Sequence, residues 1–234
     1  MEPSSPQDVI HAFHRLYYDL QEQTRENNTW LGVKTWKCPL DLWVYQELLY
    51  RVRPDVVVET GTYKGGSAYF MAGIFDLMSH GRVLTIDVDE DGDRPEHERI
   101  DYITGSSVDP AVLARVRQEV AGTETVLVIL DSDHRRDHVL AELREYSRIV
   151  TPGSYLIVED TNINGHPVRA EYGPGPREAV EIFLADTHDF VPDATCEKFL
   201  LTWNGGGYLR RVPGRETPLR TSGFWASDSD AAVD

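Results

Sequence analysis

Acidic side chains follow two apolar runs that the sequence predicts to be strands. Asp131 ends the run from Val126 to Asp131, and Glu159 and Asp160 end the run that begins at Tyr155. In a doubly wound sheet these two strands are neighbours roughly 5 Å apart. Their carboxyl ends therefore place three carboxylates around one point.

Carboxylates crowded in this way raise one another's pKa unless a cation neutralises them. A hard divalent ion such as Mg²⁺ prefers oxygen ligands and keeps waters that a substrate can displace. The pattern therefore predicts a metal site formed by Asp131, Glu159 and Asp160. Helix caps and a solvated loop would explain Asp131 or Asp160 singly, but they explain the whole group less well.

His134 follows Asp131 by three residues and is expected at the mouth of the same site. A neutral imidazole there could take a proton from a hydroxyl whose pKa a metal has lowered. His134 is thus the candidate general base, against the alternative of a surface histidine at a helix start. Asp133 could be a ligand, could orient His134 or could cap the helix.

A glycine-rich segment runs from Glu59 to Ser67, between the first strand of the expected sheet and the helix that follows. Gly61 suits a tight turn, Gly65 permits a close backbone approach, and Ser67 stands beside a helix N-terminus. Asp87 lies 26 residues beyond Gly61 at the end of the next strand, where a carboxylate can accept both hydroxyls of a ribose. These residues predict a nucleoside cofactor, with Lys64 of the same segment beside it.

The spacing GxxxGG differs from the GxGxxG of dinucleotide sites, and the acid Glu59 would repel a phosphate. A sulfonium cofactor tolerates that acid, so S-adenosylmethionine is favoured over NAD. Ser106, after the third strand, could meet the adenine, although such a tripeptide with Gly105 is more often only a turn. An ordinary glycine-rich turn with a solvated Asp87 is the alternative.

Short apolar runs alternating with helical patterns predict a mainly parallel α/β sheet, Rossmann-like, from Pro54 onward. A late pair joined by Asn204-Gly205-Gly206 predicts an antiparallel hairpin. The expected strands are 56–59, 82–87, 102–104, 126–131, 155–159, 197–203 and 207–212. The expected helices are 8–20 with Asp8 as N-cap, 39–52, 67–79, 110–120, 136–150 and 176–185.

Composition sets further limits. The 234 residues are 41% hydrophobic and carry a net charge of −16, so neither disorder nor binding to nucleic acid or an anionic membrane is expected. No apolar run spans a membrane and no secretory signal begins the chain, which indicates a cytoplasmic protein. Cys38 and Cys196 are expected to be reduced structural thiols.

With these residues in view, the chain resembles the cephalosporin hydroxylase and rhamnosyl O-methyltransferase family of S-adenosylmethionine-dependent proteins. The resemblance covers Lys37 to Val212, and four segments carry it: 39–47, 59–67, 131–134 and 158–161. The acid spacing is also similar to that of metal-dependent O-methyltransferases acting on macrolide sugars. The resemblance implies a class I methyltransferase fold and Mg²⁺ held by Asp131, Glu159 and Asp160. It also implies that His134 is the base and that Glu59, Gly61, Ser67 and Asp87 lie at the cofactor.

The resulting hypothesis is methyl transfer from S-adenosylmethionine to a hydroxyl of a small glycosylated natural product, most plausibly a deoxysugar such as rhamnose. Asp131 is assigned catalytic and cofactor contacts besides the metal. Three alternatives stay open: hydroxylation or methoxylation of a cephalosporin, a non-catalytic cofactor-binding module, and an NAD-dependent oxidoreductase. Residues 1–53 are expected to form a helical cap or an oligomerisation segment of a homo-oligomer, 54–212 the methyltransferase domain, and 213–234 a mobile or partly ordered tail.

Overall fold

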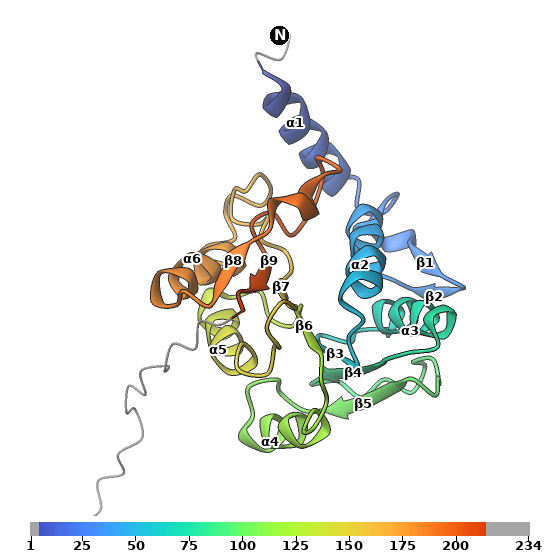
Figure 1. The fold of residues 1–234 in the computed structure, drawn as a ribbon. Coiled ribbons are helices and arrows are strands. Elements are labelled where there is room, and N and C mark those ends of the chain that lie inside the picture. The colour runs from blue at the N-terminus through green and yellow to red at the C-terminus, as the bar shows by residue number, and fades with distance from the viewer. Residues whose placement is uncertain (1–4, 214–234) are drawn as a thin grey trace, which may run out of the picture.

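The structure is a computed structural model that describes residues 5–213. A seven-stranded sheet has the order β5-β4-β3-β6-β7-β9-β8, with β5 to β7 parallel and β9 antiparallel to both of its neighbours (Figure 1). The strand bounds are β3 Val56–Thr60, β4 Arg82–Asp87, β5 Ile100–Thr104, β6 Val126–Leu130, β7 Tyr155–Val158, β8 Phe190–Pro192 and β9 Tyr208–Arg211.

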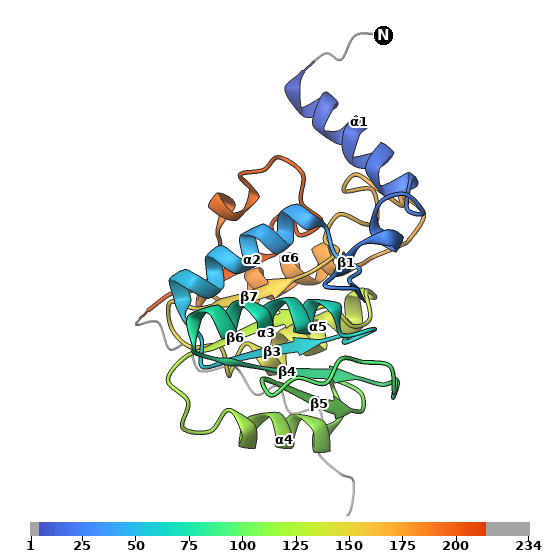
Figure 2. The same cartoon turned by 90° about the vertical axis from the view of Figure 1, so that its right-hand side faces the viewer.

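Helices cover both faces of this sheet, as a doubly wound fold requires. The apolar strand residues alternate between two cores: Val57 packs with α2 and α3, whereas Val56 and Val58 pack with α4, α5 and α6 (Figure 2). The bounds are α2 Pro39–Val52, α3 Gly66–Met78, α4 Pro110–Glu119, α5 Arg136–Tyr146 and α6 Pro176–Asp186. The expected α/β fold with a mainly parallel sheet is therefore confirmed.

The antiparallel C-terminal pair is confirmed, but its first strand was placed wrongly. The expected strand 197–203 is absent: Ala194–Glu197 form a short 3-10 helix, and β9 pairs with β8 instead. The reason is that the alternating apolar residues leave the sheet: Leu201 and Trp203 pack into a cluster with Tyr18. The backbone N–H of Trp203 donates to the Asp41 carboxylate and not to the carbonyl of a neighbouring strand.

The N-terminal segment begins with α1, Pro6–Asp19, which projects from the body of the molecule (Figures 1 and 2). Its N-cap is Ser5, not the expected Asp8; the Ser5 hydroxyl oxygen accepts from the Asp8 N–H. A 3-10 turn, Arg25–Asn27, and two short strands, β1 Thr29–Trp30 and β2 Val33–Lys34, follow; the sequence analysis did not predict these strands.

Two other expectations can be compared with the described residues. Cys38 and Cys196 are both buried free thiols, as expected. No helix among residues 5–213 is long and apolar enough to cross a membrane. The expected C-terminal tail, 213–234, lies outside the described residues except for Pro213.

His14 anchors α1 to the body and should make the stability of the protein depend on pH. Its ring is buried and its Nε2 lies 2.9 Å from Nδ2 of Asn162. Burial, with smaller contributions from His11 and Arg15, lowers the pKa of His14 to about 4. The unfolded chain therefore binds more protons than the folded one between that pH and about 6.5, so folding is weakened as the pH falls through this range.

We expect the melting temperature to decline from pH 6.5 towards pH 4, and to decline less steeply in His14→Gln, which has no imidazole to charge. Scanning fluorimetry of both proteins across this range measures the difference. Parallel curves would show that His14 is not responsible.

Candidate functional site

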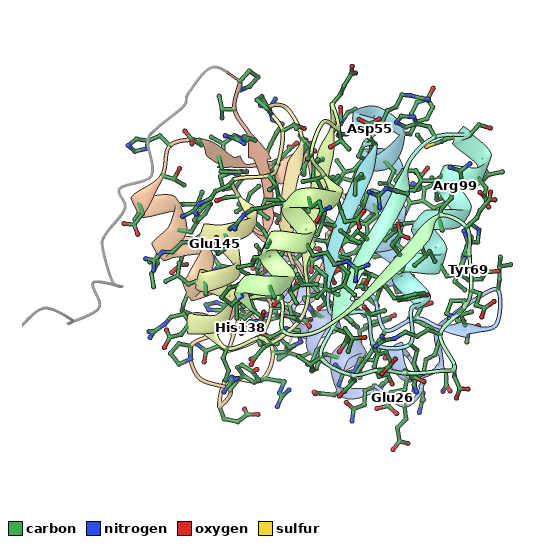
Figure 3. The ribbon with its side chains drawn as sticks, turned by 90° about the horizontal axis from the view of Figure 1, so that it is seen from below. Glu26, Asp55, Tyr69, Arg99, His138 and Glu145 are labelled. Atoms are coloured by element: carbon green, nitrogen blue, oxygen red, sulfur yellow. The ribbon has the colours of Figure 1, made fainter. Side chains whose placement is uncertain are left out.

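A cavity of about 720 Å³ opens at the carboxyl ends of the parallel strands. Between β3 and β6 the strand order reverses, and ligands of open α/β sheets bind at such a point. In Figure 3, Glu26 of the N-terminal segment and His138 of α5 lie towards one end of the sheet, whereas Asp55, which precedes β3, lies towards the other. Arg25 and His138 both line the cavity, so the N-terminal segment forms part of its wall.

The turn after β3 forms one end of the cavity. Gly61 has φ +86°, and a Cβ built on it would lie 1.9 Å from the Asp131 carbonyl oxygen. Only glycine fits at this position because the backbone after β3 closely approaches the backbone after β6. The turn thus places Gly61 and Asp131 on the same wall of the cavity.

Asp87, Lys64 and Ser106 also line this end of the cavity, as expected. The Asp87 carboxylate accepts from the backbone N–H groups of Tyr63 at 2.7 Å and Asp89 at 3.1 Å, which fix its orientation. Nη2 of Arg94 also lies 3.4 Å from Oδ2. A carboxylate has about four acceptor positions, so capacity for a ribose hydroxyl remains. Lys64 is paired with Asp91.

Two of the expected cofactor residues lie behind the cavity wall. Glu59 is fully buried and accepts hydrogen bonds from the hydroxyls of Ser67 and Thr85. Burial raises the pKa of its carboxyl, opposed by the Lys37 charge and these two hydrogen bonds. Ser67 lines the cavity, whereas Glu59 and Gly65 do not. Glu59 therefore acts on the cavity through Ser67, and a direct contact with a cofactor stays a prediction.

The same cavity holds the acidic cluster, and one of its members, Asp131, lies beside the turn after β3. Asp131, His134 and Asp160 each offer one atom, and these atoms lie within 4.8 Å of one another, a spacing that one metal ion could bridge. Nε2 of His134 is 3.2 Å from Oδ2 of Asp160. Asp160 has φ +54°, a left-handed conformation that is costly for a residue with a side chain. We call these three residues the open cluster.

Glu159, the third expected metal ligand, is not part of the open cluster. Its Oε1 accepts from the Tyr45 hydroxyl at 2.6 Å and from the Lys37 ammonium group. The same Lys37 nitrogen donates to Oδ2 of Asp131. A metal ion alone was expected to neutralise these acids, whereas the Lys37 ammonium group neutralises part of their charge from inside the protein.

Lys37 is 3% exposed and stays protonated in this environment. Burial by itself would lower its pKa, but the charges of Asp131 and Glu159 outweigh burial and raise it. For the two acids, burial raises the pKa and Lys37 opposes the rise; repulsion from Asp131 raises that of Glu159 further. Lys37 is therefore a fixed positive charge and is unsuited to accept a proton from a substrate.

Asp133 lines the cavity but is not part of the open cluster. Its carboxylate accepts from the Arg135 backbone N–H at 2.9 Å and from the Arg135 side chain. These hydrogen bonds lower the pKa of Asp133. These contacts indicate that Asp133 orders the turn before α5.

Sequence reasoning missed Lys37 and Tyr45 as residues of the site. Lys37 is 94 residues from Asp131 in the chain, and no spacing rule connects an ammonium group in a loop to a strand end so far away. Tyr45 lay inside a segment that carried the family resemblance, but its helical spacing indicated only core packing. Both are placed by α2 and the loop before it.

Removing the Lys37 charge should destabilise the fold, because two buried acids then lose their counter-ion. We expect Lys37→Met to lower the free energy of unfolding by about 3–5 kcal/mol. In the double variant with Glu159→Gln, part of that loss should be recovered. Urea denaturation at neutral pH measures each value. Lys64→Met is the matched control, because its ion pair with Asp91 is exposed and should matter far less. Equal losses in the two single variants would contradict this interpretation.

The chain is similar in sequence to a family of known proteins. Residues 22–212 match the family model described as Rhamnosyl O-methyltransferase/CmcI. A protein named Rhamnosyl O-methyltransferase from Mycobacterium tuberculosis is 38% identical over 88% of this chain and 86% of its own length. One of the same name from Mycobacterium leprae is 36% identical over 87% and 90%.

Among solved structures, one titled as CmcI with Mg and SAM superposes with a TM-score of 0.62 at 23% identity, covering 80% of this chain and 77% of that one. A putative caffeoyl-CoA O-methyltransferase from Staphylococcus aureus gives a TM-score of 0.53 at 14% identity, covering 81% and 87%. These similarities show a shared fold. The chain belongs to the rhamnosyl O-methyltransferase/CmcI family and is an S-adenosylmethionine-dependent O-methyltransferase.

Proposed function

We propose that this enzyme transfers the methyl group of S-adenosylmethionine to a ring hydroxyl of rhamnose, or of a similar deoxysugar, on a small glycosylated molecule, with the help of Mg²⁺. The observation that carries the proposal is that one cavity joins the two halves of such a reaction. Gly61, Asp87 and Ser106 line this cavity together with the three residues of the open cluster.

The cavity fits the cofactor in size and chemistry. Its volume is in the range of small-molecule sites. Asp87 would accept the ribose hydroxyls, and Ser106 would lie at the adenine. Bound there, the cofactor supplies a methyl group on a positively charged sulfur. The acids beside the cavity suit such a cation and would repel the pyrophosphate of NAD, so the oxidoreductase alternative is not favoured.

The open cluster fits a hard divalent ion. With Asp131, Glu159 and Asp160 all ionised, Lys37 leaves a net charge of −2 beside the cavity, which one divalent cation would neutralise. Asp131 and Asp160 are the proposed ligands, since Mg²⁺ prefers oxygen, and Glu159 stays with Lys37 and Tyr45. Bound there, Mg²⁺ supplies positive charge that lowers the pKa of a hydroxyl beside it.

His134 is the proposed general base. As the sugar oxygen forms its bond to the methyl carbon and the carbon–sulfur bond breaks, the hydroxyl proton passes to the His134 imidazole, whose Nε2 faces Asp160. Asp160 Oδ2, 3.2 Å from that nitrogen, stabilises the imidazolium that results. Holding both reactants in one cavity makes the displacement effectively unimolecular, which is worth several kcal/mol.

The substrate class rests on the relatives. Curated proteins 38% identical to this chain over 88% of its length are named rhamnosyl O-methyltransferases. The cephalosporin alternative is separated from this proposal by the experiment that follows. The expected homo-oligomer and the cytoplasmic location stay predictions, as does the division at residue 53.

Incubation with isotopically labelled S-adenosylmethionine tests the activity directly. We expect label in a rhamnosyl glycoside and none in a cephalosporin, with turnover lost in excess EDTA and restored by Mg²⁺. Mass spectrometry of the acceptor is the readout. Full turnover in EDTA would exclude the metal, and labelling of the cephalosporin alone would exclude the proposed substrate.

His134→Gln tests the base. We expect turnover to fall at least about 100-fold, because general-base catalysis contributes that much. The dissociation constant for the cofactor should stay within about twofold, because His134 belongs to the open cluster and is not one of the proposed cofactor contacts. Rapid-quench kinetics and calorimetry provide the two measurements. His80→Gln is the matched control, since His80 contacts the Arg53 carbonyl outside the cavity. Retained turnover in the His134 variant would remove the base from the proposal.

A further inference from the structure

The loop from Thr202 to Gly207 is joined to the residues that follow β7. The Asn162 N–H donates to the Trp203 carbonyl at 3.1 Å, and the Thr161 hydroxyl donates to the Gly205 carbonyl at 2.8 Å. At Gly207 a Cβ would lie 2.2 Å from the Val158 carbonyl oxygen, so the approach is as close as backbone allows. The Asn-Gly-Gly sequence, expected to be a hairpin turn, instead lies against the end of β7.

Asn204 is the polar centre of this loop. Its side chain is completely buried. Oδ1 accepts from the backbone N–H of Asp160 at 3.2 Å, and Nδ2 donates to the Tyr45 hydroxyl at 3.3 Å. One amide therefore contacts the backbone of Asp160 directly and contacts Glu159 through Tyr45, which donates to Oε1 of Glu159.

Asp160 needs such a contact because of its backbone. With φ +54° it occupies the left-handed region, which is uncommon for a residue with a side chain even though aspartate enters it more often than most. This conformation turns the chain sharply after β7, so that Glu159 lies with Lys37 and Tyr45 whereas Asp160 joins Asp131 and His134 in the open cluster. The hydrogen bond from Asp160 N–H to Asn204 fixes the peptide group at this turn.

We propose that Asn204 is a positioning residue: it holds Asp160 in the left-handed conformation that directs its carboxylate into the open cluster and thereby sets the affinity of that cluster for a divalent ion. The inference rests on the proposed function, because it concerns the metal site proposed there. Asn204 itself does not line the cavity and need not touch substrate or cofactor.

The test measures Mn²⁺ binding by the electron paramagnetic resonance signal of the free ion, without any turnover. We expect Asn204→Leu, which is similar in size but lacks both polar atoms, to weaken Mn²⁺ binding at least about tenfold. Asn204→Ser, too short to reach the Asp160 N–H, should give a similar loss and serves if the leucine variant does not fold. Calorimetry with S-adenosylhomocysteine in EDTA should show a dissociation constant within about twofold of the original for both.

Two further variants separate positioning from general loosening. Thr202→Val removes hydrogen bonds to Asp41 and to the Asn204 N–H in the same loop but leaves the contact to Asp160, so Mn²⁺ binding should change less than about twofold. Tyr45→Phe removes the hydrogen bonds of that hydroxyl with Glu159 and with Asn204 Nδ2 but leaves the Asn204 contact to Asp160. Its effect on Mn²⁺ binding should therefore fall between those of the Asn204 and Thr202 variants.

Each remaining outcome overturns the inference. Mn²⁺ binding by both Asn204 variants within about twofold of the original protein would show that Asn204 does not position the cluster. An equal loss in Thr202→Val, or a parallel loss of S-adenosylhomocysteine binding, would show a general effect on folding. Failure of the original protein to bind Mn²⁺ would overturn both this inference and the metal of the proposed function. The proposed function would survive every other negative result.

Discussion

The acidic ends of β6 and β7 can lie together inside the protein because a buried ammonium group lies against them. Asp131 and Glu159 come from neighbouring parallel strands, and Lys37 donates to both. Moving such charges out of water costs several kcal/mol per ion, and only close opposite charges with good hydrogen bonds offset that cost. Tyr45 supplies one of these hydrogen bonds to Glu159. The remaining acid, Asp160, is left to face the cavity with His134.

This arrangement makes the site depend on segments far apart in the chain. Lys37 lies in the loop before α2, the strand ends lie in the middle of the chain, and Asn204 lies in a loop near the end. Each contributes a polar group that would be costly to bury alone, and together they satisfy one another. The cavity wall is built similarly, since Arg25 is stacked between the rings of Tyr18 and Trp36, which also line it. The N-terminal segment therefore forms part of the cavity wall.

Two parts of the cavity wall, the glycine turn after β3 and the acidic cluster, differ in how they are built. At the glycine turn the geometry depends mainly on the backbone. Gly61 permits the close approach to Asp131, and backbone N–H groups orient the Asp87 carboxylate. In the acidic cluster, side chains from distant segments determine the geometry. A backbone requirement selects particular residues at particular positions, such as a glycine after a strand. The glycine turn after β3 could therefore be predicted from spacing. A buried ion pair between distant residues requires no local sequence pattern. For that reason the expectation that a metal alone neutralises the acids was incomplete.

The sequence by itself determined the parallel sheet, the helices that cover it, and the meeting of Asp131 with Asp160 and His134, because strand periodicity and topology fix which residues stand at the carboxyl ends of neighbouring strands. Only the tertiary structure decided that Glu159 turns to Lys37 and Tyr45, that Glu59 lies behind Ser67, and that residues 197–203 leave the sheet. Those outcomes depend on which distant side chain supplies a charge, a hydrogen bond or an apolar surface. These pairings form only in the packed chain, where they offset the cost of burying polar groups. No local pattern of residues indicates them.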